Sequence, residues 1–263
     1  MTQTFHAVVL AGDRGPEDPV AKHTGAPCKA LVPVAGRPML LRVLDALAGS
    51  AAIDGVTLVG PQAVQVEQCP ELVERIARGA LAWQPPQASP SLSAAAALAQ
   101  VPADRPVLLT TADHALLRAP WVDAFCEQAL ASGQDAVVGL ARHAAVQAAF
   151  PGSKRTALRF RDDAYCGCNL FAFLTPAGRR APTFWRQLEQ QRKRPHRLAA
   201  ALGLGTLAAY LCGRLTLAGG LGRLSDKVGA QLGAVLLDDP RAAVDVDSVA
   251  DFERVQSVLM RDA

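Results

Sequence analysis

The sequence predicts an α/β fold in three layers, with a mostly parallel, Rossmann-like sheet covered by helices on both faces. Short continuous apolar runs, such as residues 5–12 and 106–113, are typical of strands buried on both sides. Segments with helical spacing follow most of these runs, as a crossover between parallel strands requires. The length of 263 residues, half of them apolar, is sufficient for one large core. We therefore expect a single domain spanning residues 1–263.

Composition and charge exclude several classes of protein. Charged residues make up 19% of the chain, and its 21 glycines and 18 prolines follow no period, which excludes disordered, coiled-coil and collagen-like chains. The net charge of +3 is too small to indicate binding to nucleic acid or to an anionic membrane. We therefore expect small-molecule partners and no nucleic acid; the sequence leaves the oligomeric state open.

The distribution of the six cysteines indicates a reducing compartment. They are scattered along a long chain that starts without the basic stretch and cleavage site of a signal peptide, so we expect free thiols and a cytoplasmic protein. The Cys166-x-Cys168 pair lacks a second pair at zinc spacing and is more simply interpreted as packing. The longest uncharged run, residues 198–213, is too short to span a membrane and predicts a buried helical pair.

The first half of the chain repeats a strand–helix unit. Residues 5–12 form the opening strand, and a helix over 36–47 starts near Pro38 and buries Leu40, Val43, Leu44 and Leu47. The same alternation predicts strands over 55–60, 81–83, 106–113 and 135–141, and helices over 71–78, 93–100 and 120–132.

The pattern changes after Arg142. Residues 156–161 and 168–174 are predicted as successive strands without an intervening helix, which favours antiparallel pairing. From about 175 to 232 the pattern is helical throughout and predicts an insertion, in which the basic run 192–194 is most simply a solvated helix end. Short strands over 233–239 and 242–246 precede a final helix that Ser248 and Asp251 cap.

Four polar clusters follow predicted strands, where ligands bind in open α/β sheets. The first, residues 10–15, offers glycines and Arg14, with Lys29 farther along the same loop, and these residue types suit a phosphate. It has neither a dinucleotide-binding glycine pattern nor a Walker A sequence. The second cluster delivers Asp113, which could hold Mg²⁺ or simply cap a helix.

The other two clusters lie in the second half of the chain. Gly167 and Asn169 accompany a predicted strand, where the asparagine could bind a sugar or close a turn. Asp245 and Asp247 flank Val246 and would point to the same side if the strand persists. Either aspartate could face a metal ion.

These motifs together, LAGDRG with Lys29 and GRPMLLRVLDAL, then TTADHALL, GCNLF and DVDSVADF, resemble those of the MobA-like nucleotidyltransferases of the NTP transferase superfamily. The resemblance implies a sheet of the nucleotide-diphospho-sugar transferase type and covers nearly the whole chain outside the helical insertion. It implies a nucleotide site at Leu10, Ala11, Gly12, Asp13, Gly15, Ser91 and Ser93, and substrate contacts from Gly167 and Asn169.

The resemblance also implies a Mg²⁺-dependent transfer of NMP from an NTP to an acceptor, with release of pyrophosphate. Arg14 and Lys29 would contact the phosphates, while Asp113 and Asp247 would hold Mg²⁺, with Asp245 in reserve. Asp13 replaces the family's usual second glycine, and a carboxylate there repels phosphate unless it turns away or meets a cation. Ala115 stands where proline is usual.

Some roles stay open at this stage. The cations Lys154, Arg155, Arg159 and Arg161 favour a phosphorylated or acidic acceptor, or else protect a solvated edge strand. His114 is a possible general base but is more simply an incidental, exposed loop residue, and Ser93 could equally be a helix N-cap. Alternative functions are a nucleotide-sugar-dependent glycosyltransferase and a non-catalytic nucleotide-binding module.

Overall fold

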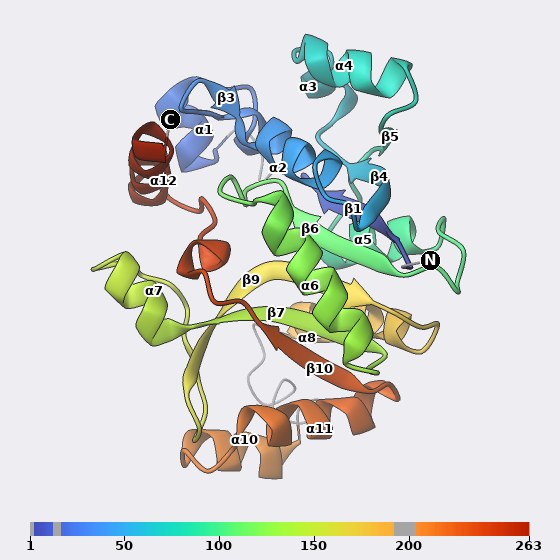
Figure 1. Cartoon of the computed structure of the whole chain (residues 1–263), viewed down its shortest axis with the longest axis vertical. Helices are drawn as coiled ribbons and strands as arrows, with labels where there is room; N and C mark the ends of the chain where they lie inside the picture. The colour runs from blue at the N-terminus through green and yellow to red at the C-terminus, as the bar shows by residue number, and fades with distance from the viewer. Residues whose placement is uncertain (1–2, 13–16, 192–202, 263) are drawn as a thin grey trace.

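A sheet of eight strands forms the centre of the molecule in the computed structural model, which describes residues 3–12, 17–191 and 203–262 (Figure 1). The strands follow the order β10-β7-β9-β6-β1-β4-β5, and β8 pairs with β9 beside this path. Their bounds are β1 Phe5–Leu10, β4 Ile53–Val59, β5 Ala82–Gln84, β6 Val107–Thr111, β7 Ala136–Arg142, β8 Leu158–Arg159, β9 Ala164–Phe173 and β10 Leu232–Leu236. The predicted mostly parallel α/β fold is confirmed.

Strand β9 is the antiparallel element in the middle of this sheet. Strands β1, β4, β5 and β6 pair in parallel, as do β7 and β10, whereas β9 runs antiparallel to both β6 and β7. The antiparallel pairing predicted for two successive strands without a helix between them is found between β8 and β9, and β9 has this reversed direction against β6 and β7 as well. Consequently the early part of β9 reaches the edge of the sheet where β6 ends.

Helices cover the two faces of the sheet and make the predicted three layers. One face packs against α2 Met39–Ala48 and α6 Ala119–Ala131, and the other against α5 Pro90–Leu98 and α8 Ala181–Gln191 (Figure 1). Alternate residues of β1 belong to opposite cores: Ala7 and Val9 to the first, Val8 and Leu10 to the second. A strand buried on both sides requires the unbroken apolar run seen in the sequence.

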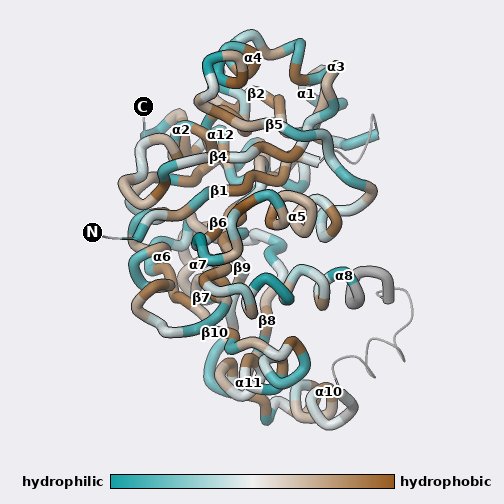
Figure 2. The backbone as a smooth tube through the Cα atoms, turned by 90° about the vertical axis from the view of Figure 1, so that its right-hand side faces the viewer, coloured by the Kyte–Doolittle hydropathy of each residue, from teal (hydrophilic) through white to brown (hydrophobic). Residues whose placement is uncertain are grey.

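The remaining elements lie around this sandwich. They are α1 Pro19–Thr24, η1 Lys29–Leu31, β2 Pro33–Val34, β3 Arg37–Pro38, α3 Ala63–Val66, α4 Pro70–Ala77, α7 His143–Ala149, η2 Gly178–Arg180, α10 Leu204–Leu211, α11 Leu217–Val228, η3 Pro240–Ala243 and α12 Val249–Asp262. Helices α3 and α4 lie at one end of the long axis and α10 and α11 at the other (Figure 2). In the same view the hydrophobic segments gather along the strands.

The structure corrects several local predictions. Residues 242–246 do not form a strand, because η3 occupies Pro240–Ala243 and extended chain follows it. The predicted strand over 156–161 is only Leu158–Arg159. Pro38 lies in the short strand β3 and is the N-cap of α2. It therefore stands one residue before the first helical position, Met39, and not within the first turn as predicted.

Of the predictions for the second half of the chain, one is confirmed and another is wrong. Residues 205–213 are half-buried or exposed, and Leu211 is 74% exposed, so the predicted buried helical pair is wrong for this part. The basic run 192–194 lies outside the described residues. The capping box of α12 is confirmed, since Ser248 N donates to Asp251 at 3.1 Å and Asp251 N donates to Ser248 at 3.2 Å. Among the described residues, the structure has no helix long and apolar enough to cross a membrane.

The end of β1 is a topological switch point. Its parallel neighbours, β4 and β6, lie on opposite sides of it, so a crevice opens at its carboxyl end. Gly60, directly after β4, packs closely against the chain leaving β1: it has φ +84°, and a Cβ atom there would lie 2.8 Å from the Ala11 carbonyl oxygen. Only glycine allows both this conformation and this approach.

We expect Gly60→Ala to destabilise the protein and to displace the chain at Ala11. Gly79→Ala is a matched control, because Gly79 has a similar φ of +73° but open space where its Cβ would lie. Both variants have the conformational cost of about 1 to 2 kcal/mol for a left-handed residue, and only Gly60→Ala adds the backbone collision. Equal losses of unfolding free energy in urea would show that the close approach is unimportant.

Candidate active site

A cavity of about 740 Å³ opens at the carboxyl ends of β1 and β6. Its walls come from the chain after β1, the η1 segment, the start of α5, the early part of β9, and the segment before α12. The lining residues are Leu10, Ala11, Gly12, Pro27, Lys29, Ala30, Gln62, Gln65, Pro86, Gln87, Ala88, Ser89, Pro90, Ser93, Leu109, Thr111, Ala112, Asp113, Asn169, Phe171, Trp185, Asp245 and Asp247. Most sequence-predicted site residues within the described part of the chain thus meet in one place.

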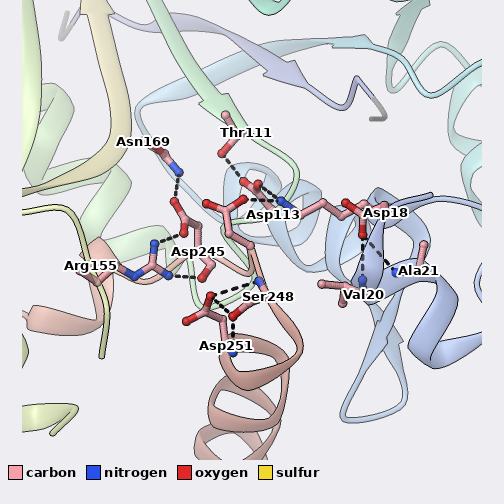
Figure 3. Close-up of polar contacts among 12 residues, drawn as sticks. Asp18, Val20, Ala21, Thr111, Asp113, Arg155, Asn169, Asp245, Ser248 and Asp251 are labelled. Atoms are coloured by element: carbon pink, nitrogen blue, oxygen red, sulfur yellow. Dashed lines mark hydrogen bonds and ion pairs between the residues drawn. The ribbon is translucent and has the colours of Figure 1, made fainter. Parts of the chain in front are cut away.

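Asp113 stands just beyond the end of β6. The Thr111 hydroxyl donates to Asp113 Oδ1 at 2.6 Å and fixes the carboxylate at the cavity (Figure 3). The backbone nitrogen of Val246 donates to the Asp113 carbonyl oxygen at 3.1 Å. This bond brings the segment with Asp245 and Asp247 to the loop after β6, although 134 positions separate Asp113 from Asp247.

Lys29 joins the two carboxylates. Its Nζ donates to Asp113 Oδ2 at 2.7 Å and to Asp247 Oδ1 at 2.8 Å, so these oxygens are at most about 5.5 Å apart by the same two distances. The lysine side chain is only 9% exposed. Burial alone would lower the pKa of Lys29, but the two carboxylates outweigh it and raise that pKa above its ordinary value. The lysine predicted to contact phosphates is here the counter-ion of the two predicted metal ligands.

Asp245 and Asp247 face different partners. Arg155 binds both the carboxylate and the carbonyl oxygen of Asp245, and Asn169 Nδ2 donates to Asp245 Oδ2 at 2.7 Å (Figure 3). The strand that would set both aspartates on one side does not continue through them, yet both line the cavity. Arg155 is one of the four cations predicted to attract an anionic acceptor. In the structure it forms an ion pair with Asp245 instead.

Asn169 occupies an unusual backbone position on β9. Its φ is +50°, and the pairing of β9 with β7 shifts register between Val138 and Leu140. A non-glycine residue in this region costs free energy, and such residues concentrate at functional sites. The bulge places Asn169 within reach of Asp245. Gly167, the other predicted substrate residue, pairs with Leu140 and does not line the cavity.

The side of the cavity near α5 differs in detail from the prediction. Ser89, not Ser93, caps the helix by accepting from Leu92 N at 3.3 Å. Ser93 lines the cavity and accepts from Gln87 N at 2.9 Å. Ser91 is fully buried with its hydroxyl 2.9 Å from that of Ser89, and does not line the cavity.

The chain after β1 is described only in part. Leu10, Ala11 and Gly12 line the cavity as predicted. Asp13, Arg14 and Gly15 lie outside the described residues.

His114 and two cysteines belong to the core. His114 is 1% exposed, and burial lowers its pKa to about 4, so the expectation of an exposed loop histidine is wrong. Cys166 and Cys168 are buried free thiols on β9, and burial raises the pKa of Cys168 to about 12. Since the thiolate is the metal-binding form, the packing interpretation of this pair is favoured. Among the described residues, no group of three or more His, Cys, Asp or Glu side chains is placed to hold a metal.

Part of the cavity wall is aromatic and was not predicted from the sequence. Phe171 on β9 and Trp185 on α8 both line the cavity and stack on each other, with ring centroids 6.4 Å apart and an interplanar angle of 22°. The period-2 pattern of β9 places Phe171 on the same face as Asn169, and this signal was available in the sequence. Trp185 carried no such signal, because it lies on a helix, 14 residues after Phe171 in the chain.

The fold and the cavity define an α/β enzyme of the nucleotide-binding transferase class, with carboxylates and a lysine at the end of the central strands. The model of the MobA-like NTP transferase domain matches residues 7–186, more than half of the chain. The chain therefore belongs to the MobA-like NTP transferase family, and it is a nucleotidyltransferase.

Solved structures show the same fold. A hypothetical transferase from Thermus thermophilus is 29% identical, with a TM-score of 0.77 over 95% of this chain and 100% of that one. A CMP:2-keto-3-deoxy-manno-octonic acid synthetase complexed with CTP is 14% identical, with a TM-score of 0.58 over the whole of both chains. The 4-diphosphocytidyl-2C-methyl-D-erythritol synthase from Anaerococcus prevotii is 12% identical, with a TM-score of 0.60 over 98% of this chain and 97% of that one. A comparison with curated proteins found no match.

We expect the effects of Lys29→Met and Asp247→Asn on the free energy of unfolding to be strongly coupled. Removing the lysine takes away the cation that bonds to both carboxylates, which lowers the free energy of unfolding by about 1 to 3 kcal/mol. In the Lys29→Met background, Asp247→Asn should lower the free energy of unfolding by less than it does in the wild type, because it also removes the repulsion between Asp113 and Asp247. A double-mutant cycle in urea measures the coupling.

Lys22→Met supplies the control for this cycle. Lys22 pairs with Glu17 at 2.5 Å, but both side chains are largely exposed, so the change should stay within about 0.5 kcal/mol. Additive effects of the Lys29 and Asp247 substitutions would contradict the coupling that their contact implies.

Proposed function

We propose that this nucleotidyltransferase moves an NMP group from an NTP to a small-molecule acceptor within the described cavity. An acceptor oxygen attacks the α-phosphorus, the bond from that phosphorus to the bridging oxygen breaks, and pyrophosphate leaves. Such transfers depend mainly on positioning and charge neutralisation. The observation that carries the proposal is the convergence of Lys29, Asp113 and Asp247 next to Gly12 at the end of β1.

Asp113 and Asp247 fit the Mg²⁺ ion that the family resemblance implies. Their oxygens already enclose a positive charge, at 2.7 and 2.8 Å from the Lys29 nitrogen. Two carboxylates with substrate phosphates are a donor set that suits Mg²⁺. Bound there, the ion would neutralise charge on the phosphates.

Lys29 would have to change partners when nucleotide and metal bind. If Mg²⁺ held the two carboxylates, the Lys29 ammonium group would be able to donate to a phosphate oxygen instead, the role that the sequence predicts. The two carboxylates raise the pKa of Lys29 in the structure, and the negative charge of a phosphate would favour its protonated form in the same way. The glycine at position 12 leaves open space where a Cβ would lie, which supports close approach of a phosphate to the backbone.

Several finer predictions remain parts of this proposal. They are phosphate contacts from Arg14 and the chain around Asp13 and Gly15, nucleotide contacts from Ser93, and a cytoplasmic location. Free thiols at Cys69, Cys126, Cys166, Cys168 and Cys212 support a reducing compartment. The phosphorylated or acidic acceptor also remains part of the proposal. Of the four cations that suggested it, Arg155 is bound to Asp245, and the other three, Lys154, Arg159 and Arg161, do not line the cavity.

The nucleotide site is tested by thermal unfolding with ATP, CTP, GTP and UTP, each with and without Mg²⁺. A ligand at 100 times its dissociation constant stabilises by about 2.7 kcal/mol, which corresponds to roughly 5 to 10 °C for a chain of this size. We expect at least one NTP to give such a shift with Mg²⁺. No shift with any of the four would overturn the proposal.

Asp113→Asn and Asp247→Asn should remove the Mg²⁺-dependent part of that shift and reduce turnover by a hundredfold or more, in line with loss of an essential electrostatic group. Asp54→Asn is the control, because Asp54 pairs with Thr4 and Arg105 outside the cavity wall. Release of pyrophosphate from an NTP supports the proposed reaction, whereas release of a nucleoside diphosphate from a nucleotide sugar would favour the glycosyltransferase alternative.

A further inference from the structure

Arg155 holds one peptide unit in the wall of the cavity from behind. Its guanidinium group donates to the Asp245 carboxylate and, through a second nitrogen, to the Asp245 carbonyl oxygen (Figure 3). That carbonyl belongs to the same peptide unit as the Val246 N–H, which donates to the Asp113 carbonyl oxygen at 3.1 Å. Because a peptide unit is planar and its C=O and N–H groups point in opposite directions, the two bonds together fix the orientation of the chain that leads to Asp247.

Asp245 and Asp247 differ in how they are held. Both carboxylate oxygens of Asp245 have a partner, Oδ1 in Arg155 and Oδ2 in Asn169, and the side chain is only 16% exposed. The Asp247 side chain is 47% exposed, and its Oδ1 accepts from Lys29 in the cavity. This contrast suits Asp247 to contact with a ligand and Asp245 to anchoring the segment.

The positive charge of Arg155 would by itself oppose a metal ion. Arg155 does not line the cavity, but it is bound to the segment that carries Asp247, and like charges repel each other. Loss of this charge alone would therefore strengthen the binding of Mg²⁺ between Asp113 and Asp247. Weaker binding after removal of Arg155 would thus report the loss of positioning and not the loss of charge.

We propose that Arg155 is a positioning residue of the metal site: through the peptide unit between Asp245 and Val246, it keeps the Asp247 carboxylate opposite that of Asp113, where both would hold Mg²⁺. The inference rests on the proposed function, because it concerns the metal site of that reaction. It takes Asp245 out of the candidate metal ligands and assigns it to the support of the segment. Removing a group that orients metal ligands typically weakens metal binding by about 10- to 100-fold.

The test measures metal binding to the whole chain without acceptor, so that no turnover is needed. The first readout is the free Mg²⁺ concentration that gives half of the thermal shift at saturating NTP, using the NTP that gives the largest shift with the wild type. The second is the binding of Mn²⁺ in place of Mg²⁺, followed by the relaxation of water protons, which does not depend on the stability of the variant.

The variants are Arg155→Met, Arg155→Lys and the double variant Arg155→Met/Asp245→Asn. The double variant removes both charges of the ion pair and so leaves no unpaired, largely buried carboxylate that could prevent folding. If Arg155→Met does not fold, the other two variants decide. Arg142→Met is the matched control, since Arg142 forms an ion pair with Asp163 at 2.6 Å outside the cavity wall.

We expect Arg155→Met and the double variant to weaken both Mg²⁺ and Mn²⁺ about tenfold or more. The double variant should be no weaker than Arg155→Met, because Asp245 is not a ligand. Arg155→Lys should lie between Arg155→Met and the wild type, since lysine keeps the charge but lacks the planar fork that reaches two oxygens. Arg142→Met should leave the affinity for both metals unchanged.

The outcomes separate this inference from the proposed function. If the wild type shows its Mg²⁺-dependent shift and the Arg155 variants bind both metals as tightly as the wild type, or more tightly, the inference is overturned and the transfer reaction stands. A double variant that is much weaker than Arg155→Met also overturns it, because Asp245 would then be a metal ligand. If the wild type shows no shift with any NTP, the proposed function fails and the inference fails with it.

Discussion

The site depends on a buried lysine held between two carboxylates from opposite ends of the chain. Lys29 lies in η1, Asp113 follows β6, and Asp247 precedes α12. Two carboxylates this close repel each other, and a cation between them removes the repulsion. The backbone bond from Val246 to Asp113 holds the two segments together independently of the side chains. The acidic centre is thus held together with its charge compensated.

The third carboxylate that lines the cavity in the described chain, Asp245, is also paired with a cation. Arg155 lies behind Asp245, as Lys29 lies between Asp113 and Asp247, so each carboxylate that lines the cavity in the described chain has a basic partner. The two partners differ in accessibility to a ligand: Lys29 lines the cavity and Arg155 does not. Among the described residues, the cavity therefore offers a ligand a basic side chain only at its Lys29 end.

Strand β9 connects the fold to this division of the cavity. It enters the sheet antiparallel between β6 and β7, and this reversal carries Asn169 and Phe171 to the edge where β6 ends. Its register shift opposite β7 and the positive φ of Asn169 direct the amide toward Asp245. The helical segment that follows returns as α8 and places Trp185 over Phe171. One irregular strand therefore supplies Asn169 and Phe171 to the wall of the cavity.

The sequence by itself determined the sheet, its strands and the residues at their carboxyl ends, because apolar runs and helical spacing are local patterns that burial enforces. It also indicated Lys29, Asp113 and Asp247 as members of one site. Only the tertiary structure decided how these groups pair, since Lys29 meets Asp247 across 218 positions and Arg155 meets Asp245 across 90. It likewise decided that His114 is buried, that residues 242–246 leave the strand conformation, and that Trp185 reaches the cavity. Contacts between segments so far apart depend on how whole elements pack, and no local periodicity encodes them.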